Sequence, residues 1–262
     1  MAHRVISQSI TRSRQGLSLL RNLPLLLLAC FCASLSAADL SAYTEEWPPY
    51  NFSDKDQVKG IATDILRAAC AEAKITCDIQ IVPWARALST VSTMPNSLLY
   101  TTARKPSREK DFLWIGPILP RSTWVFSKAN DPAIPDFNAL ARKKTGVVRG
   151  EASIEDLELE GIPGSAMTVE SSNALVLKLL TKGWIDAMVD TEIGMGWNLR
   201  NAGLPQNTVK KDIRLSDKGA YYFAMNLKSD LAIRDRLQSA VEKLRHRGNI
   251  DKIILSYTST RQ

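Results

Sequence analysis

The chain of 262 residues is long enough for one large domain or two lobes of ordinary size. Its 45% hydrophobic and 23% charged residues are typical of a soluble globular protein, and no stretch after residue 38 is apolar enough to span a membrane. The net charge of +7 falls to +3 without the first 38 residues, which hold four basic and no acidic residues. No cluster of Lys and Arg with interleaved aromatics stands out in the rest of the chain, so we expect no nucleic-acid partner.

Residues 1–38 have the pattern of a secretory signal peptide. Basic residues precede an apolar stretch from Leu23 to Leu35, and small residues follow it directly. This stretch is shorter than the roughly 20 residues that a spanning helix needs. We expect cleavage near Ala37 or Ala38 and a periplasmic location. A competing interpretation is a lipoprotein signal with an acylated Cys30, although a bulky leucine stands where such signals favour a small residue.

After the leader, short apolar runs alternate with amphipathic helical patterns. The predicted strands are 39–43, 78–82, 97–101 and 123–127, and the predicted helices are 61–73 and 85–91. This βαβ order favours a mostly parallel sheet with helices on both faces.

A turn-rich connector at 130–136 opens a second cycle of the same kind. Strands are predicted at 145–149, 167–169, 184–189 and 220–224, and helices at 153–159 (capped by Ser153), 173–182 and 230–245, before a short terminal helix. We predict an α/β fold of two lobes, with the second inserted into the first: 39–122 and 217–262 form lobe 1, and 123–216 form lobe 2. Ligands of such sheets bind in the crevice at the carboxyl ends of the strands.

The exported chain would keep two of the four cysteines, Cys70 and Cys77. In an oxidising compartment they are a plausible disulfide, and closing so short a loop stabilises a fold by roughly 2.5 kcal/mol. The alternative is a pair of buried free thiols. With His246 as the lone histidine outside the leader, we expect no metal site and no cofactor.

The order of several short motifs resembles the bacterial extracellular solute-binding proteins of family 3, the substrate-binding components of ABC transporters. The motifs are EWPPYNF at 46–52, GIATDIL at 60–66, PWARAL at 83–88, RKPSRE at 104–109, FLWIGP at 112–117, GVVRG at 146–150 and GWIDA at 183–187. This resemblance implies the two-lobed, type II periplasmic-binding-protein fold. The spacing of Cys70 and Cys77 is also similar to that of a disulfide in some members of the family.

The same resemblance places Arg108 at the position of the family's carboxylate-binding arginine. A guanidinium offers paired donors that match a carboxylate and remains charged at any working pH. Arg104 is the rival candidate. The alternative for either residue is a surface arginine paired with Glu109 or Asp111.

Four further residues of lobe 1 are candidates for ligand contacts. Trp47 and Trp84 each lie beside a proline in loops that the resemblance places at the cleft, where an aromatic face can hold an aliphatic or cationic group. Either tryptophan can instead belong to the core. Tyr100 and Thr102, near the end of a predicted strand, are candidates for hydrogen bonds to the ligand.

In lobe 2, Asp190 follows a predicted strand where relatives place the acid that receives the ligand's ammonium group, although the spacing differs and Glu192 competes for the role. Arg149, Gly150 and Glu151 follow another strand, and amides at the start of the next helix can hold an anion. Relatives that bind α-amino acids often have a threonine in this turn, which is missing here.

These residues predict a receptor whose lobes close on a small polar, amino-acid-like ligand. We expect a monomer that delivers the ligand to the membrane permease of an ABC transporter and that is not an enzyme. One alternative is a sensory module for a membrane kinase. Another is a dehydratase-like enzyme, in which Glu151, Asp190 or Glu192 would carry the acid-base chemistry.

Overall fold

The fold is mixed α/β, with two five-stranded sheets that define two lobes. The computed structural model describes residues 38–216 and 219–258. The chain leaves the first sheet after Pro120, builds the second sheet, and returns to the first at Ala220. Lobe 2 is therefore inserted into lobe 1, as predicted, while the predicted signal peptide lies outside the described residues.

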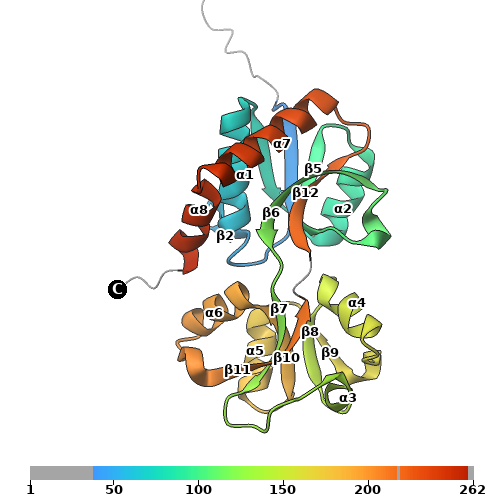
Figure 1. The fold of residues 1–262 in the computed structure, drawn as a ribbon, viewed down its shortest axis with the longest axis vertical. Helices are drawn as coiled ribbons and strands as arrows, with labels where there is room; N and C mark the ends of the chain where they lie inside the picture. Colours follow the sequence, from blue (N-terminus) through green and yellow to red (C-terminus); the bar gives the residue numbers. More distant parts are fainter. Residues whose placement is uncertain (1–37, 217–218, 259–262) are drawn as a thin grey trace, which may run out of the picture. The chain divides into compact units, whose positions relative to one another are not determined.

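The sheet of lobe 1 has the strand order β4-β1-β5-β12-β6 (Figure 1). Its strands are β1 (Leu40–Thr44), β4 (Cys77–Ile81), β5 (Ser97–Ala103), β6 (Phe112–Pro120) and β12 (Ala220–Asn226), and a small hairpin joins β2 (Phe52–Asp54) to β3 (Gln57–Lys59). β1 pairs in parallel with β4 and β5, whereas β12 runs antiparallel to both of its neighbours.

The sheet of lobe 2 has the order β11-β7-β10-β8-β9. Its strands are β7 (Thr123–Lys128), β8 (Thr145–Val148), β9 (Met167–Glu170), β10 (Ala187–Thr191) and β11 (Val209–Ser216). β7 is antiparallel to β10 and β11, and the remaining pairs are parallel. Both sheets are therefore mixed, and the expectation of mostly parallel sheets was wrong. The chain enters lobe 2 on β7 and returns to lobe 1 on β12, and each of these strands runs antiparallel to its neighbours.

Helices cover both faces of each sheet (Figure 1). The helices of lobe 1 are α1 (Ile61–Ala73), α2 (Trp84–Thr93), α7 (Leu231–His246) and α8 (Asn249–Thr258), and those of lobe 2 are α3 (Phe137–Leu140), α4 (Ala152–Leu159), α5 (Asn173–Thr181) and α6 (Glu192–Asn201). Alternation along β5 explains the layers: Leu98 and Tyr100 join the cluster under α1 and α7, and Leu99 joins the cluster under α2.

The loop that carries Trp47 is fixed to the start of α1. The backbone amides of Ile61 and Ala62 donate to the carbonyl oxygens of Pro49 (2.9 Å) and Tyr50 (2.8 Å). Gly60 lies between these segments with φ +125°, and a Cβ there would lie 2.3 Å from the Tyr50 carbonyl oxygen. Glycine is needed here both for the backbone angle and for the close approach.

Some predicted element limits require correction. The predicted strand at 184–189 is β10, which begins only at Ala187, because Trp184 lies in a turn with 64% of its surface exposed. Ser153 does not cap α4: the residue at the cap is Glu151, and the Ser153 hydroxyl donates to the Glu151 carboxylate (3.3 Å).

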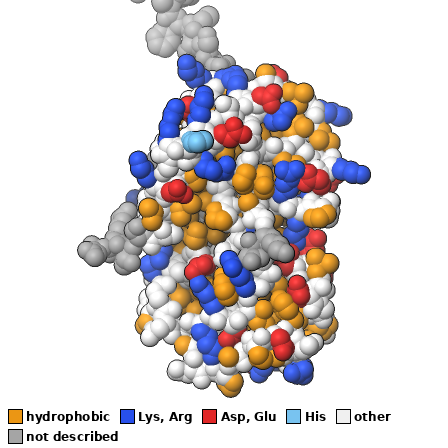
Figure 2. Space-filling view, viewed as in Figure 1, with side chains coloured by type: hydrophobic (Ala, Val, Ile, Leu, Met, Phe, Trp, Pro, Cys, Tyr) orange, Lys and Arg blue, Asp and Glu red, His pale blue; other side chains and the backbone are white. Residues whose placement is uncertain are grey.

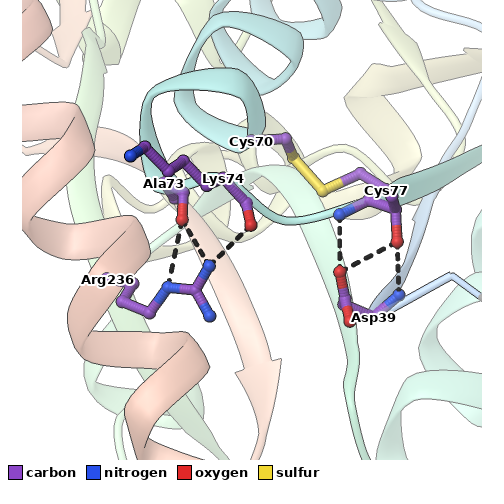
Figure 3. Close-up of a disulfide and its surroundings, with 7 residues drawn as sticks. Asp39, Cys70, Ala73, Lys74, Cys77 and Arg236 are labelled. Carbon is purple, nitrogen blue, oxygen red and sulfur yellow. Dashed lines mark hydrogen bonds between the residues drawn. A yellow bond between two sulfur atoms is a disulfide. The ribbon is translucent and has the colours of Figure 1, made fainter.

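A disulfide joins Cys70 at the end of α1 to Cys77 at the start of β4, as predicted (Figure 3). The loop between them is also held by Arg236, whose guanidinium donates to the carbonyl oxygens of Ala73 and Lys74 (Figure 3). The Asp39 carboxylate accepts from the Thr76 amide (2.7 Å). Three independent contacts therefore fix this corner of lobe 1.

Removing the disulfide should lower stability without changing ligand binding, because this corner is formed by residues outside the candidate site described below. For a loop closed over a separation of seven residues, we expect a Cys70→Ala/Cys77→Ala variant to lose about 2.5 kcal/mol, or about 5 to 10 °C in melting temperature. Differential scanning calorimetry of the wild type with and without reductant tests this. A reductant effect of equal size in the variant would contradict it.

No helix among the described residues is long and apolar enough to cross a membrane. On the face drawn in Figure 2, basic and acidic side chains are interspersed.

Candidate functional site

One small pocket, with a cavity volume of about 50 Å³, is lined by residues of both lobes and of the first crossing between them. Lobe 1 contributes Glu45, Trp47, Trp84, Thr101, Ala103, Arg108 and Tyr221, the crossing contributes Arg121, and lobe 2 contributes Thr123, Gly150, Glu151, Ala152, Ser153, Asp190 and Thr191. Several of these residues stand at or just beyond strand ends, where open α/β sheets bind ligands.

Arg108 is the last residue of a short 3-10 helix, Pro106–Arg108, that follows β5. Its guanidinium carbon lies 5.7 Å from the centre of the Trp84 ring, a cation-π distance. The side chain is half-buried and lines the pocket. It can therefore present paired donors to a carboxylate while Trp84 covers one of its sides.

Glu45 follows β1 and brings a carboxylate to the same wall. Burial raises its pKa to about 7, and the positive charge of Arg108 opposes that shift. Its neighbour Trp47 packs against the rings of Tyr50 (4.5 Å between ring centres) and Tyr221 (5.4 Å). These two ring contacts fix the orientation of the Trp47 indole, which lines the pocket.

Asp190 lies in β10 and is 2% exposed. Its carboxylate accepts hydrogen bonds from the Thr191 amide (2.6 Å) and the Asn198 side chain (2.9 Å). Burial nevertheless raises its pKa to about 7. Gly194 leaves room for this carboxylate, because a Cβ there would lie 2.4 Å from an Asp190 oxygen.

Glu151 stands at the start of α4, after a turn in which Gly150 has φ +81°. Its carboxylate accepts from the Asn173 side chain (3.1 Å) and from the Ser153 hydroxyl. Burial raises its pKa to about 8, and the negative charges of Asp190 and Glu45 add to that shift. Three carboxylates from three elements therefore share one electrostatic environment.

A buried ion-pair network connects the lobes beside the pocket. Lys105 of lobe 1 is 8% exposed, and its ammonium donates to the Ala152 carbonyl oxygen (2.9 Å) and the Glu155 carboxylate (2.9 Å). It also lies 3.1 Å from Asp156, which in turn pairs with Arg121 in the first crossing.

A second contact between the lobes joins two buried hydroxyls. The Tyr50 hydroxyl donates to the Thr191 hydroxyl oxygen (2.9 Å), which also accepts from the Gly194 amide. Nearby, Thr101 has φ +62° and donates to the Asn51 side chain (2.6 Å). A β-branched residue rarely adopts this backbone conformation, and such residues cluster at functional sites.

Six of the ten predicted ligand-binding residues line this pocket, and four do not. Those at the pocket are Trp47, Trp84, Arg108, Gly150, Glu151 and Asp190. Tyr100 is fully buried and shares a hydrogen bond with Thr63 (3.2 Å), and Thr102 is buried. Arg104 pairs with Glu109 and lies near the rings of Trp114 and Tyr222. Arg149 is exposed and borders a neighbouring cavity, and the competitor Glu192 is also exposed, paired with Lys211.

Sequence reasoning missed several residues of the pocket, of which Glu45 and Arg121 bring charge. A signal existed for Glu45, since it directly follows the first strand, at the edge where ligands bind. Arg121 lies between the last strand of the first part of lobe 1 and the first strand of lobe 2, in a connecting segment where a charged residue is ordinarily solvated. Its burial depends on Asp156, which no local pattern connects to it.

Comparison with known proteins gives a family and several structural relatives. The family model for bacterial extracellular solute-binding proteins, family 3, matches residues 41–260. The amino-acid-binding protein AabA of Dichelobacter nodosus is 24% identical over 239 residues, which cover 86% of this chain and 91% of that protein.

Solved structures show the same fold. A histidine kinase sensor domain with similarity to periplasmic binding proteins has a TM-score of 0.74 at 18% identity and covers 84% of this chain and 96% of its own. The GluR0 ligand-binding core of Nostoc punctiforme, in complex with L-glutamate, has a TM-score of 0.72 at 16% identity. The match covers 84% of this chain and 100% of that structure. An ancestral arginine-binding protein bound to arginine has a TM-score of 0.71 at 17% identity. The match covers 83% of this chain and 97% of that structure.

Proposed function

Because this chain belongs to the bacterial extracellular solute-binding proteins of family 3, we propose that it is a periplasmic receptor for a small, polar, amino-acid-like solute. The observation that carries this proposal is the pocket between the lobes, where Arg108 of one lobe and Asp190 of the other line the same cavity. An α-amino acid carries a carboxylate and an ammonium group, which these two side chains complement.

Binding proceeds by closure of the lobes. The ligand first contacts Arg108 and the two tryptophans of lobe 1, and lobe 2 then brings Asp190 and the Gly150 turn against it. The crossing near 119–123 absorbs the rotation, together with a return crossing near 213–219, of which residues 217 and 218 lie outside the described part of the chain. The ligand shifts the equilibrium because the closed form offers contacts that the open form lacks.

The receptor delivers its ligand, unchanged, to the membrane permease of an ABC transporter and acts as a monomer. A second candidate role is ligand sensing for a membrane kinase, which the likeness in fold to a kinase sensor domain favours. Affinity purification from membranes separates the two roles, since a permease is recovered in the first case and a kinase in the second.

A screen of L-amino acids by thermal shift tests the proposed function. A ligand at a hundred times its dissociation constant stabilises the folded form by about 2.7 kcal/mol, which raises the melting temperature by about 5 to 10 °C. We expect at least one amino acid to bind with about micromolar affinity in calorimetry and to reduce the radius of gyration in small-angle X-ray scattering. Binding without compaction would contradict lobe closure, and mass spectrometry that found the ligand converted would contradict a pure receptor.

A further inference from the structure

The pocket described above adjoins a second cavity of about 90 Å³, and the two share Glu45, Trp47 and Glu151 in their linings. The second cavity continues toward Asn173 at the start of α5 and toward Arg149. Together they offer an elongated space with Arg108 and Asp190 in the first part and the two glutamates at the junction. A ligand longer than the backbone portion of an amino acid can occupy both.

The junction is rich in hydrogen-bond acceptors. Glu45 and Glu151 place carboxylates there, and Asn173 adds a side-chain oxygen that is buried without a hydrogen-bond partner. The amide nitrogen of Asn173 donates to Glu151, whereas the side-chain oxygen of Asn173 has no partner among the described residues. A buried acceptor without a partner costs free energy, which a ligand with several N–H donors would recover.

The charges that line the pocket also favour a ligand with a cationic group. The lining has three carboxylates, Glu45, Glu151 and Asp190, and two guanidiniums, Arg108 and Arg121. Arg121 forms an ion pair with Asp156. Lys105 forms ion pairs with Asp156 and Glu155. Arg108 is therefore left to balance three acidic groups.

Burial raises the free energy of these carboxylates in their ionised forms when no positive charge lies among them. The pKa values of Glu45, Glu151 and Asp190 are all raised, to about 7, 8 and 7. A cationic group among these carboxylates favours their ionised forms.

We infer that the ligand is an elongated basic amino acid, with its carboxylate on Arg108, its α-ammonium group toward Asp190, and a second cationic group at the junction formed by Glu45, Glu151 and Asn173. This inference rests on the proposed function and adds the class of ligand. Arg149 and Glu46 also line the second cavity with opposite charges, and the Glu46 carboxylate accepts hydrogen bonds from Ser53.

Calorimetry with matched compounds tests the class of ligand. L-lysine should bind at least about a hundredfold more tightly than L-norleucine, its neutral analogue of similar shape, because norleucine leaves the buried acceptors unpaired. L-glutamine and L-glutamate serve as further neutral and acidic probes, and L-arginine as a second basic one. Tighter binding of a neutral or acidic amino acid would overturn this inference and leave the proposed function standing. Failure of every compound to bind would overturn both.

Cadaverine, which is lysine without its carboxylate, tests the assignment of Arg108. It should bind at least about tenfold more weakly than lysine, because it leaves the guanidinium without its anion. Equal affinity would overturn the inference of an amino acid in favour of a polyamine.

Replacing Glu151 with glutamine tests the junction. Glu151→Gln should weaken lysine binding at least about tenfold and norleucine binding far less, since the lost contact concerns the second cation. Glu158→Gln, on the exposed side of the same helix, is the matched control and should leave both affinities unchanged. Thermal melting confirms that both variants fold. Equal loss of lysine and norleucine binding would overturn the assignment of the second cation to this junction.

Lysine binding should also release protons. Because the carboxylates bind protons below their raised pKa values and the cation requires them ionised, affinity should fall about tenfold from pH 8 to pH 6. Calorimetry in two buffers of different ionisation enthalpy measures the protons released. Unchanged affinity across this range, with no proton release, would overturn the inference.

Discussion

Replacing Arg108 with alanine should lower ligand affinity about a hundredfold, or about 3 kcal/mol, because truncating one partner of a desolvated charge pair costs 2 to 5 kcal/mol. Its guanidinium lines the pocket beside the Trp84 ring, and its charge acts on the nearby Glu45 carboxylate. The loss should appear mainly as faster dissociation, which stopped-flow fluorescence of the nearby tryptophans can follow.

Arg104→Ala is the matched control. Arg104 lies four residues earlier and has the same chemistry, but it pairs with Glu109 and does not line the pocket. Isothermal titration calorimetry should find that Arg104→Ala binds the ligand within about threefold of the wild-type affinity, since exposed ion pairs contribute little free energy. An equal loss in both variants, or none at Arg108, would show that the carboxylate binds elsewhere. Arg108→Lys should recover part of the affinity, because an ammonium keeps the charge and loses the paired geometry.

The helices with clear local signals could be predicted from the sequence, and those without them could not. The predicted helix at 61–73 coincides with α1, because Gly60 and the left-handed Lys74 stop it at both ends. In contrast, α6 contains Gly194 and Gly196, which lower helix propensity, and it forms because its apolar side chains pack against α5.

Four strands were missed: the short hairpin strands β2 and β3, and the longer strands β6 and β11. β6 contains Gly116, Pro117 and a terminal proline, which interrupt the pattern of a strand. β11 carries four charged residues, as suits a strand at the edge of its sheet, and therefore reads as a loop. Its pairing with β7 is a long-range contact that no short window of sequence contains.

The candidate site was predictable only where a residue stands next to a strand end or a recognisable motif. Arg108 and Asp190 met that condition. Sequence alone could not decide which of Arg104 and Arg108 lines the pocket, because this depends on which of the two forms the ion pair with Glu109 in the folded chain. Contacts between the lobes, such as that between Tyr50 and Thr191, join residues 141 positions apart and are decided by the tertiary fold.

The Lys105 network makes a second large effect testable. The Lys105 ammonium contacts the Ala152 carbonyl oxygen, Glu155 and Asp156, all in lobe 2, so these bonds exist only while the lobes are in contact. Lys105→Met keeps the length and the apolar stem of the side chain and removes the charge. Hydrogen bonds to charged groups contribute about 1.5 to 3 kcal/mol, so the closed form should become about tenfold to a hundredfold less favoured relative to the open form.

Ligand affinity should fall by the same factor, because the apparent dissociation constant rises as the competent form becomes less populated. Asp156 keeps its pairing with Arg121, so the substitution does not leave that carboxylate isolated. Lys110→Met, at an exposed position of the same segment, is the control and should bind as the wild type does. Scattering at saturating ligand should show the same compact form in all three proteins. Wild-type affinity in Lys105→Met would mean that the network does not stabilise closure, and that the charges lining the pocket hold the lobes together.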